Sequence, residues 1–574
     1  MLARPAIGTL LRASKAEKIA LAVLWSGCLI YGIGAGFLIG GDVHHFGLAV
    51  IALQIFVFLP AAVYALRFQG KAAGASSTLH FRPIASPFVL PFLAVMLATG
   101  YVVARGVLEP DASAYRFQAT IFANGELSAP APPGAVNTPD TPQPIDFTHH
   151  IVHDGRWFSK YPVGWPAVLA IPEKLHFGWA AAPLLGALLL VIAGWIAREA
   201  FGAATVAPSL WIAVLSPYWL ATCVEVLSDA LCAVLVAGAC LYCLRALRGR
   251  SARNFALMYA FLVPAFLVRP YTALVASVVY GIAALLWSWR NRSLFIRVAS
   301  ISVLAGAAAI ALVLLFNFLY TGSALLSPYA LYKGRAVPNE ITASPALIFE
   351  NLLQGWRFTA QSVLAFSFPL VFVLAAYGLW SQRRSWQAWL LALLFPALVV
   401  AYLADSGGPS SVVGERYWFE GFVGIVILAG QGLLALASAW SPSRRLVAAG
   451  IAAITCAQIC LTVAAIQVLA SRGRPYAVVR AAAEKFQDCR CAVFVGDAPP
   501  DFYSRNMDLN TAGWQSAKAF YFNDPGPGYR QTWANRYGWR SWAVIDYDPQ
   551  TEKAATRLFH AAASPAASSQ GVRN

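Results

Sequence analysis

Charged residues are scarce in this 574-residue chain. They make up only 12% of the sequence, while hydrophobic residues make up 59% of it and the mean hydropathy is +0.60. Soluble domains are about 25% charged, so these values lie far from their average. The shortage of charge excludes an ordinary soluble domain and indicates an integral membrane protein.

Features of several other protein classes are also missing. The net charge is +16, yet no basic soluble segment is present that would suit a nucleic acid. No Gly-rich nucleotide loop and no internal repeat typical of a duplicated transporter is found. No small-residue cleavage site precedes Gly41, so we expect the first apolar segment to be a retained span.

Cysteine gives little information. Of nine cysteines, only Cys489 and Cys491 fall outside the apolar segments. Their spacing is too tight for a comfortable intrachain disulfide and too sparse for a zinc site. We therefore expect buried or free thiols at both positions.

Long apolar runs dominate what is present. A span of about 20 apolar residues crosses a hydrocarbon core of about 30 Å, and unbroken runs do not suit a barrel of alternating strands. The sequence predicts about 13 transmembrane helices, near 18–40, 46–68, 84–107, 177–197, 203–222, 229–247, 254–268, 271–289, 298–319, 363–380, 387–404, 417–438 and 447–469.

Basic residues in the short loops set the orientation, because they gather on the cytoplasmic side of a membrane. With an odd number of spans, the N-terminus is predicted inside, and the loops over 109–176, 320–362 and 405–416 and the tail from about 470 face outward. The residues on the cytoplasmic side are Arg4, Arg12, Lys15, Lys18, Arg67, Lys71, Arg82, Arg245, Arg248, Arg250, Arg253, Arg290, Arg292, Arg297, Arg383, Arg384, Arg444 and Arg445.

Three regions follow from these patterns. Residues 1–83 are predicted to hold a cytoplasmic segment and two extra transmembrane helices, and 84–470 to hold the main membrane domain. Residues 471–574 lose the long apolar runs and predict a small extracytoplasmic α/β domain with a disordered end, from a helical stretch PYAVVRAAAEKF and strands CAVFVGDA and SWAVIDY. The Pro-rich run over 129–144 predicts an outward loop without helix or strand.

Asp111 is the leading candidate for chemistry. Pro110 ends the preceding helix, and Asp111 opens an amphipathic segment with Tyr115 on its apolar face. Partial desolvation at the membrane edge would raise the proton affinity of this carboxylate, which suits a general base. Alternatively, Asp111 caps the helix. Glu109 is a second acidic candidate.

Outward-facing cations form a second group of candidates. Lys160 lies in the turn SKYPVGWP, and Arg269 is embedded in the apolar run FLVRPYTALV. Such cations could neutralise a lipid phosphate or simply reach to headgroups and water. Arg416 has Glu420 one helical turn on as a possible partner. The other outward cations are Arg116, Arg156, Lys333 and Arg335.

Two further clusters have open interpretations. The first cluster comprises His149, His150, His153 and Asp154. Imidazoles and a carboxylate are the ligands of zinc and manganese sites, but the spacing of these residues fits no closed site, so no metal site is predicted. A second group could bind a sugar hydroxyl or an ion, or cap a helix; it comprises Glu225, Ser228 and Asp229.

Several ordered segments resemble a known family. The runs PDASAYRFQATIFANGEL, GRWFSKYPVGWP, LVRPYTAL, NFLYTGSALLSPY and GERYWFEGF, spread over about 84–440, together resemble membrane glycosyltransferases of the GT-C class. The most similar branch is protein-mannosyltransferase-like and aminoarabinose-transferase-like, as in glycosyltransferase family 39. This resemblance implies an all-α polytopic fold.

The resemblance also implies roles for residues. Asp111 matches the position of the family's proposed catalytic base, and Lys160 matches the lysine implied to contact the lipid phosphate. Where the family commonly has Asp-Glu, this chain has Ala112 after Asp111, which leaves metal dependence and acceptor type open. The substrate-binding candidates are Glu109, Tyr115, Arg116, Lys160, Tyr161, Arg269 and Arg416.

The implied activity is transfer of a sugar from a polyprenyl-phosphate donor to a hydroxyl of an envelope glycan, lipid or protein. A single inverting displacement at the outer face of the bacterial cytoplasmic membrane, among membrane lipids, requires no cofactor. Two alternatives remain open: a polysaccharide polymerase or ligase that uses a polyprenyl diphosphate glycan, and a lipid or solute transporter.

Overall fold

The computed structural model describes residues 88–103, 110–132, 149–249, 251–336, 349, 370–402, 416–439, 475–496, 510, 513 and 517–560. The spans expected near 18–40, 46–68 and 447–469, Glu109, and the tail after 560 lie outside these residues. The chain forms two compact units. A helical unit comprises Met1–Gly100, Ala182–Val313 and Asn339–Leu469, and a mixed unit comprises Tyr101–Ala181, Leu314–Pro338 and Ala470–Asn574.

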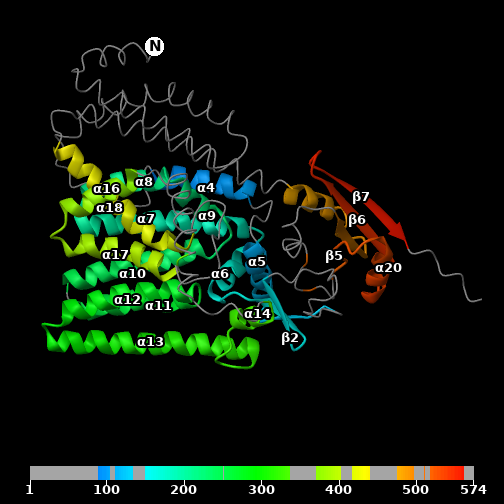
Figure 1. Ribbon diagram of the computed structural model, residues 1–574, viewed down its shortest axis with the longest axis horizontal. Helices are drawn as coiled ribbons and strands as arrows, with labels where there is room; N and C mark the ends of the chain where they lie inside the picture. The colour runs from blue at the N-terminus through cyan, green and yellow to red at the C-terminus, as the bar shows by residue number, and fades with distance from the viewer. Residues whose placement is uncertain are drawn as a thin grey trace, which may run out of the picture. The chain divides into compact units, whose positions relative to one another are not determined.

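Long apolar helices make up the described part of the helical unit (Figure 1). Five helices, or six if one bent pair is a single span, are long and apolar enough to cross a membrane within the described residues. The helices are α4 (Val89–Val103), α7 (Ala181–Phe201), α8 (Val206–Val214), α9 (Pro217–Val224), α10 (Asp229–Gly249), α11 (Ala252–Phe266), α12 (Pro270–Ser288), α13 (Arg292–Thr321), α16 (Leu370–Ser381), α17 (Trp386–Tyr402) and α18 (Phe419–Ala439), with 3-10 turns η3 (Ala203–Thr205) and η4 (Arg416–Trp418). The described residues therefore agree with a polytopic helical protein and leave the expected number of about 13 spans untested.

The span expected over 203–222 is broken, which corrects the prediction of one continuous helix. Helices α8 and α9 meet at a bend of 68°. Ser216 caps α9 by accepting a hydrogen bond from the main-chain N–H of Trp219, and Pro217 occupies the first position of the new helix. Because proline lacks an N–H and fixes φ, it starts a helix more readily than it continues one.

Glycines allow close packing around α18 in the helical unit. A Cβ on Gly432 would lie 2.0 Å from the carbonyl oxygen of Leu374 in α16, and one on Gly424 would lie 2.2 Å from that of Leu391 in α17. Either contact would force the helices apart. Small residues at these crossings let backbones approach, as is typical of helices packed in membranes.

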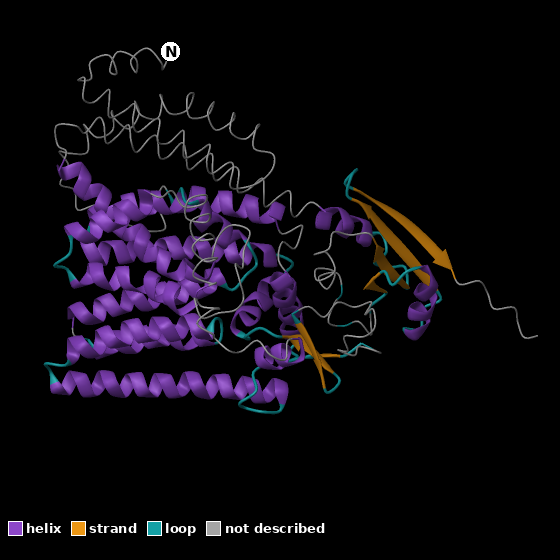
Figure 2. Cartoon of the chain, viewed as in Figure 1, coloured by secondary structure: helices purple, strands orange, loops and turns teal. Residues whose placement is uncertain are grey.

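The mixed unit holds the described part of the loop over 109–176 and the C-terminal sheet. Its elements are α5 (Pro110–Ala123), β1 (Ala129–Pro130), β2 (His150–His153), β3 (Arg156–Ser159), α6 (Gly164–Lys174), η2 (Gly178–Ala180), α14 (Pro328–Ala336), β4 (Cys491–Gly496), β5 (Ala519–Asn523), α20 (Pro527–Arg536), β6 (Ser541–Asp548) and β7 (Lys553–His560), with a further helix over 475–484. Figure 2 separates these strands from the surrounding helices by colour.

A tight hairpin lies within the loop over 109–176. Strands β2 and β3 pair antiparallel, with His150 opposite Ser159 and His153 opposite Arg156. Asp154 and Gly155 connect them with φ of 50° and 70°. Positive φ at both central residues is the geometry of a type I′ turn, for which Asp-Gly is a preferred sequence.

The Pro-rich segment is not wholly irregular, contrary to expectation. Ala129 and Pro130 form the short strand β1, with Ala129 opposite Trp157 and Pro130 opposite Arg156 in β3. Strand β1 is at the edge of its three-stranded sheet, in the order β1-β3-β2. Proline is tolerated in an edge strand because no ladder hydrogen bond from its nitrogen is required there.

The C-terminal sheet has four strands in the order β5-β4-β6-β7. Strand β4 pairs parallel with both β5 and β6, and β7 pairs antiparallel with β6. The helix over 475–484 and strands β4 and β6 correspond to the stretches singled out from the sequence. Strands β5 and β7 were not expected from it.

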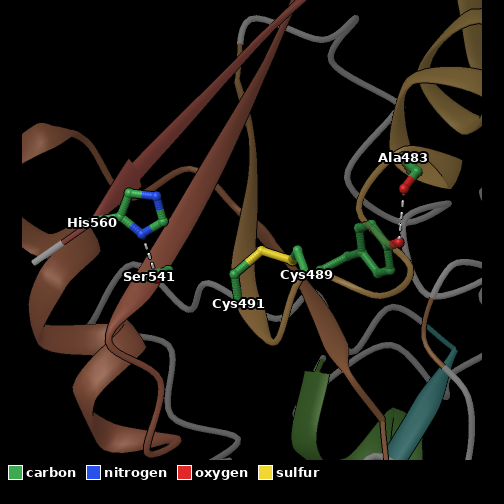
Figure 3. The surroundings of a disulfide bond; sticks show 6 residues. Ala483, Cys489, Cys491, Ser541 and His560 are labelled. Atoms are coloured by element: carbon green, nitrogen blue, oxygen red, sulfur yellow. Dashed lines mark hydrogen bonds between the residues drawn. A yellow bond between two sulfur atoms is a disulfide. The ribbon is translucent and has the colours of Figure 1, made fainter.

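Cys489 and Cys491 form a disulfide, so the expectation of thiols was wrong (Figure 3). Cys489 follows the helix over 475–484, and Cys491 begins β4. Their Cα atoms are 5.3 Å apart, which is within the usual range for a disulfide. The turn at Arg490, which has φ of 51°, brings the two cysteines together despite their tight spacing.

Candidate active site

Asp111 lies in the first turn of α5, where a carboxylate is favoured by the helix dipole. Its Oδ1 atom accepts a hydrogen bond of 2.5 Å from the hydroxyl of Tyr161, and the Nε2 atom of His149 lies 3.1 Å from the same oxygen. The side chain of Asp111 is 13% exposed. A partly buried carboxylate is thus held in a fixed orientation by two neighbours.

The hairpin explains why these neighbours meet. Its register places His149 opposite Lys160, and the main-chain N–H of Lys160 donates to the carbonyl of His149 at 3.0 Å. Tyr161 comes next in the chain. His149 has φ of 65°, in the left-handed region that non-glycine residues rarely adopt. Such a conformation persists only where surrounding contacts hold it, and it is frequent at functional sites.

Lys160 is buried among tyrosine rings. Its Nζ atom lies 4.5 Å from the ring centroid of Tyr332 and 5.0 Å from those of Tyr161 and Tyr329. Tyr329 and Tyr332 come from α14, and the hydroxyl of Tyr332 also accepts from the main-chain N–H of His149 at 3.4 Å. Aromatic faces attract an ammonium, so rings from α14 and from the segment after β3 surround this cation. We refer to Asp111, His149, Lys160, Tyr161, Tyr329 and Tyr332 as the Asp111 cluster.

Gln118 and Arg156 connect the elements that carry the cluster. The buried amide of Gln118 in α5 donates to the carbonyl of Leu127 at 2.9 Å and accepts from the main-chain N–H of Ser159 at 3.0 Å. Arg156 donates to the carbonyls of Leu319 and Tyr320, both at 2.9 Å. A cation at these last carbonyls of α13 satisfies groups that the helix leaves unpaired.

Tyr115 and Arg116 occupy different surroundings on α5. The ring of Tyr115 packs on that of Tyr161, with centroids 4.5 Å apart, and so supports the Asp111 cluster. Arg116 donates from Nε to Glu173 of α6 at 2.8 Å. Of these two predicted binding residues, the structure brings Tyr115 to the cluster and gives Arg116 a carboxylate partner.

Arg269 lies in the helical unit within a buried group of charges. Its Nη1 atom donates to Asp229 at 2.6 Å and to Glu420 at 3.1 Å. Asp229 begins α10, Arg269 caps α12, and Glu420 is in the first turn of α18, so the group ties three helix ends. We call these three residues the Arg269 cluster. Two carboxylates already compensate this guanidinium, which lessens its suitability for a phosphate.

The remaining cations have varied surroundings. Arg416 belongs to the 3-10 turn η4, with its guanidinium carbon 5.4 Å from the ring centroid of Tyr417. The ammonium of Lys333 lies 5.2 Å from the ring centroid of Tyr329. The side chain of Arg335 lies outside the described residues.

No group of three or more metal-ligating side chains occurs among the residues that the structure describes. The histidines suggested by the sequence are instead divided. His149 faces Asp111, His150 packs edge-on against Phe117, and His153 lies 3.3 Å from Asp154. Strand alternation in β2 places His150 and His153 on opposite faces. His149 lies before the strand and has φ of 65°, so its direction is set by the turn and not by the alternation.

The Asp111 cluster combines a carboxylate, an ammonium and hydroxyl and imidazole groups. The carboxylate can take a proton from a hydroxyl, and the ammonium can stabilise negative charge on a departing phosphate oxygen. Sequence reasoning did not place His149, Tyr329 and Tyr332 at this site. The Asp-Gly turn between HIVH and RWFS is the signal that could have placed His149 beside Lys160.

No family model matches the chain, and no curated protein is similar to it. Solved membrane glycosyltransferases of the GT-C class have similar folds, and this is the class that the sequence resembles.

Three such structures span most of the chain. ArnT from Cupriavidus metallidurans has a TM-score of 0.49 at 15% identity, over 81% of this chain and 93% of its own. The oligosaccharyltransferase of Archaeoglobus fulgidus has a TM-score of 0.46 at 12% identity, over 79% and 68%. Arabinosyltransferase EmbB from Mycobacterium smegmatis has a TM-score of 0.41 at 12% identity, over 76% and 45%. These distant likenesses assign neither a substrate nor a catalytic residue to this chain.

Proposed function

We propose that the protein is a membrane glycosyltransferase that moves a sugar from a polyprenyl-phosphate donor to an acceptor hydroxyl at the outer face of the cytoplasmic membrane. The observation that carries this proposal is the Asp111 cluster, in which an oriented carboxylate and a buried ammonium lie on adjoining elements. In this topology the hairpin and the C-terminal sheet are extracytoplasmic.

Asp111 acts as the general base. It removes the proton from the acceptor hydroxyl while the acceptor oxygen forms a bond to the anomeric carbon. The bond between that carbon and the phosphate oxygen breaks, and its electron pair leaves with polyprenyl phosphate. The products are the glycosylated acceptor and the lipid phosphate, and one displacement inverts the anomeric configuration.

Lys160 stabilises the departing phosphate. Its ammonium is held by aromatic faces, so it is positioned before the substrate binds and loses little freedom on binding. Tyr161 and His149 orient the carboxylate, so that Asp111 does not need to reorganise during proton transfer.

Release of polyprenyl phosphate from a panel of radiolabelled polyprenyl-phosphate sugars tests the proposal. Membranes carrying the wild type, Asp111→Asn or the control Asp154→Asn are supplied with envelope lipids and glycans. Asp154 is a suitable control because it lies in the same loop region and its side chain is 73% exposed. We expect one donor to be consumed by the wild type and the control but not by Asp111→Asn.

Two results would contradict this function. Consumption of a diphosphate-linked glycan alone would indicate a polymerase or ligase. Retention of the anomeric configuration in the product would exclude the single displacement. Normal folding of each variant is checked by its expression and thermal unfolding.

A further inference from the structure

The C-terminal sheet has two apolar faces, and both are covered. Side chains alternate along a strand, so odd and even residues of β4 pack in different cores. One face packs on the helix over 475–484. Its buried sheet residues are Cys491, Val493, Val495, Ala519, Tyr521, Ala543, Ile545 and Tyr547. The other, which we call the aromatic face, consists of Ala492, Phe494, Phe520, Phe522 and Val544.

The aromatic face shares its core with the outward loop of the membrane domain. The same buried cluster contains Phe117 and Ile121 of α5, Ala129 of β1 and Trp157 of β3. Ile121, Trp157 and Phe522 have no exposed surface. Elements that carry the Asp111 cluster therefore bury their apolar side chains in the core of the C-terminal sheet.

Charged side chains of these segments also lie near one another. Burial and the neighbouring Arg116 together lower the pKa of Arg480 to about 10, while Glu173 and Glu484 act in the opposite direction. Arg480 belongs to the helix over 475–484, whereas Arg116 and Glu173 belong to α5 and α6. Charged as well as apolar side chains of the C-terminal segment therefore lie near α5.

The shared core lies close in sequence to the reacting groups. Phe117 follows Asp111 by fewer than two helical turns on α5. Trp157 lies in β3, and Lys160 comes directly after the last residue of that strand. The rings of Phe117 and Trp157 have centroids 4.3 Å apart, so they join the helix to the strand. A shift of this ring pair would move Asp111 relative to Tyr161 and Lys160.

We propose that the aromatic face of the C-terminal sheet is a positioning surface that holds α5 and β3 together and so keeps Asp111 aligned with Tyr161 and Lys160. This inference rests on the proposed function for its catalytic consequence. The residues of the aromatic face are positioning residues, because they act through α5, which carries Asp111, and through β3, which Lys160 and Tyr161 follow. The C-terminal sheet is then required for turnover with any acceptor.

Two substitutions on one strand test this proposal in the full-length protein. Phe522→Ala removes a side chain from the aromatic face, and Tyr521→Ala removes its neighbour from the opposite face. Tyr521 packs toward the helix over 475–484, where its hydroxyl donates to the carbonyl of Ala483 at 3.1 Å. Both changes open a cavity in the same sheet, so we expect the two variants to lose a similar amount of thermal stability.

Hydrogen exchange over residues 110–123 is the first measurement. We expect Phe522→Ala to accelerate exchange in α5 by about tenfold or more, because Phe522 belongs to the same buried cluster as Phe117 and Ile121 of that helix. Tyr521→Ala should accelerate exchange over 475–484 and leave α5 as in the wild type. Equal exchange of α5 in both variants would overturn the proposal.

Turnover is the second measurement. A small misplacement of catalytic groups can cost about 100-fold in rate, so we expect kcat of Phe522→Ala to fall about 10- to 100-fold with KM for the donor nearly unchanged. Phe522→Leu, which keeps much of the volume, should restore most of kcat and serves if the alanine variant fails to fold. Absence of any transfer by the wild type would refute the proposed function, whereas the exchange result would still decide the positioning role.

Discussion

The two clusters of charged residues in this protein differ in how their cations are surrounded. Arg269 lies between two carboxylates, and all three residues are almost fully buried. Lys160 is as buried, but tyrosine rings from two elements lie around it. We propose a structural role for the guanidinium that lies between two carboxylates and a phosphate-binding role for the ammonium among the aromatic rings. Burial alone therefore does not decide which of these two roles we propose for a charge.

The largest expected effect comes from the carboxylates of the two clusters. Asp111→Asn should lower kcat about 100- to 10,000-fold, the usual contribution of a general base, with little change in Tm. Asp229→Asn should lower Tm while kcat at a permissive temperature stays within a few-fold of the wild type. Polyprenyl phosphate release and thermal unfolding measure both effects. If Asp229→Asn were as inactive as Asp111→Asn without losing stability, the contrast between the clusters would be wrong.

Removal of Arg269 should affect stability most strongly. Arg269→Met leaves Asp229 and Glu420 buried together without a cation. Removing one partner of a buried ion pair lowers the free energy of unfolding by about 3–5 kcal/mol. We expect a large fall in Tm or failure to insert stably.

A compensating substitution sharpens this test. Adding Glu420→Gln to Arg269→Met removes one of the two uncompensated carboxylates, so part of the lost Tm should return. A double variant less stable than the single one would show that the carboxylates do not depend on Arg269.

Substitution of Lys160 should affect turnover with the lipid donor. A charge-assisted contact contributes about 1.5–3 kcal/mol, so Lys160→Gln should lower kcat/KM for the donor about 10- to 100-fold. The control Lys518→Gln changes an exposed lysine that pairs with Asp488 at 2.6 Å, and it should have no effect. An unchanged kcat/KM for Lys160→Gln would assign the phosphate contact to another cation.

The smallest effects concern single tyrosine hydroxyls. Tyr161→Phe removes a hydrogen bond to Asp111, and the usual value of about 1 kcal/mol predicts a fall in kcat of about fivefold. Tyr259→Phe removes a hydrogen bond of 2.7 Å to Ser302 in the helical unit, so it should lower Tm slightly and leave kcat alone. Kinetics and unfolding of the two variants distinguish an active-site hydroxyl from a packing one.

Local patterns in the sequence were sufficient for much of the fold. Apolar runs predicted α7, α10, α12, α13 and α18, and the segment predicted to open at Asp111 is helix α5, which begins one residue earlier at Pro110. The break at Pro217 was missed because the apolar run continues through it, although Ser-Pro is a common helix start. Strands β5 and β7 were missed because each is short or mixed in character, and their pairing with distant strands decides their conformation.

The sites show where such patterns stop being informative. Asp111 and Lys160 could be singled out from their own surroundings in the sequence. The contact between Asp111 and His149 could not, because 38 residues of chain separate them and only the folded loop brings them together. Arg269 was recognisable as a charge in an apolar run. Its partner Glu420 lies 151 residues away, and no local spacing indicates that pairing. The hydrogen bond to Glu420 comes from Arg269, whereas the sequence suggested Arg416 as its partner.

The disulfide between Cys489 and Cys491 offers a way to determine on which side of the membrane the C-terminal sheet lies. Such bonds persist in oxidising compartments and are reduced in the bacterial cytosol. A thiol-labelling reagent applied to intact cells, before and after reduction, would therefore report the sidedness of the sheet through the redox state of two neighbouring cysteines. This pair can act as a built-in topology marker that requires no fused reporter.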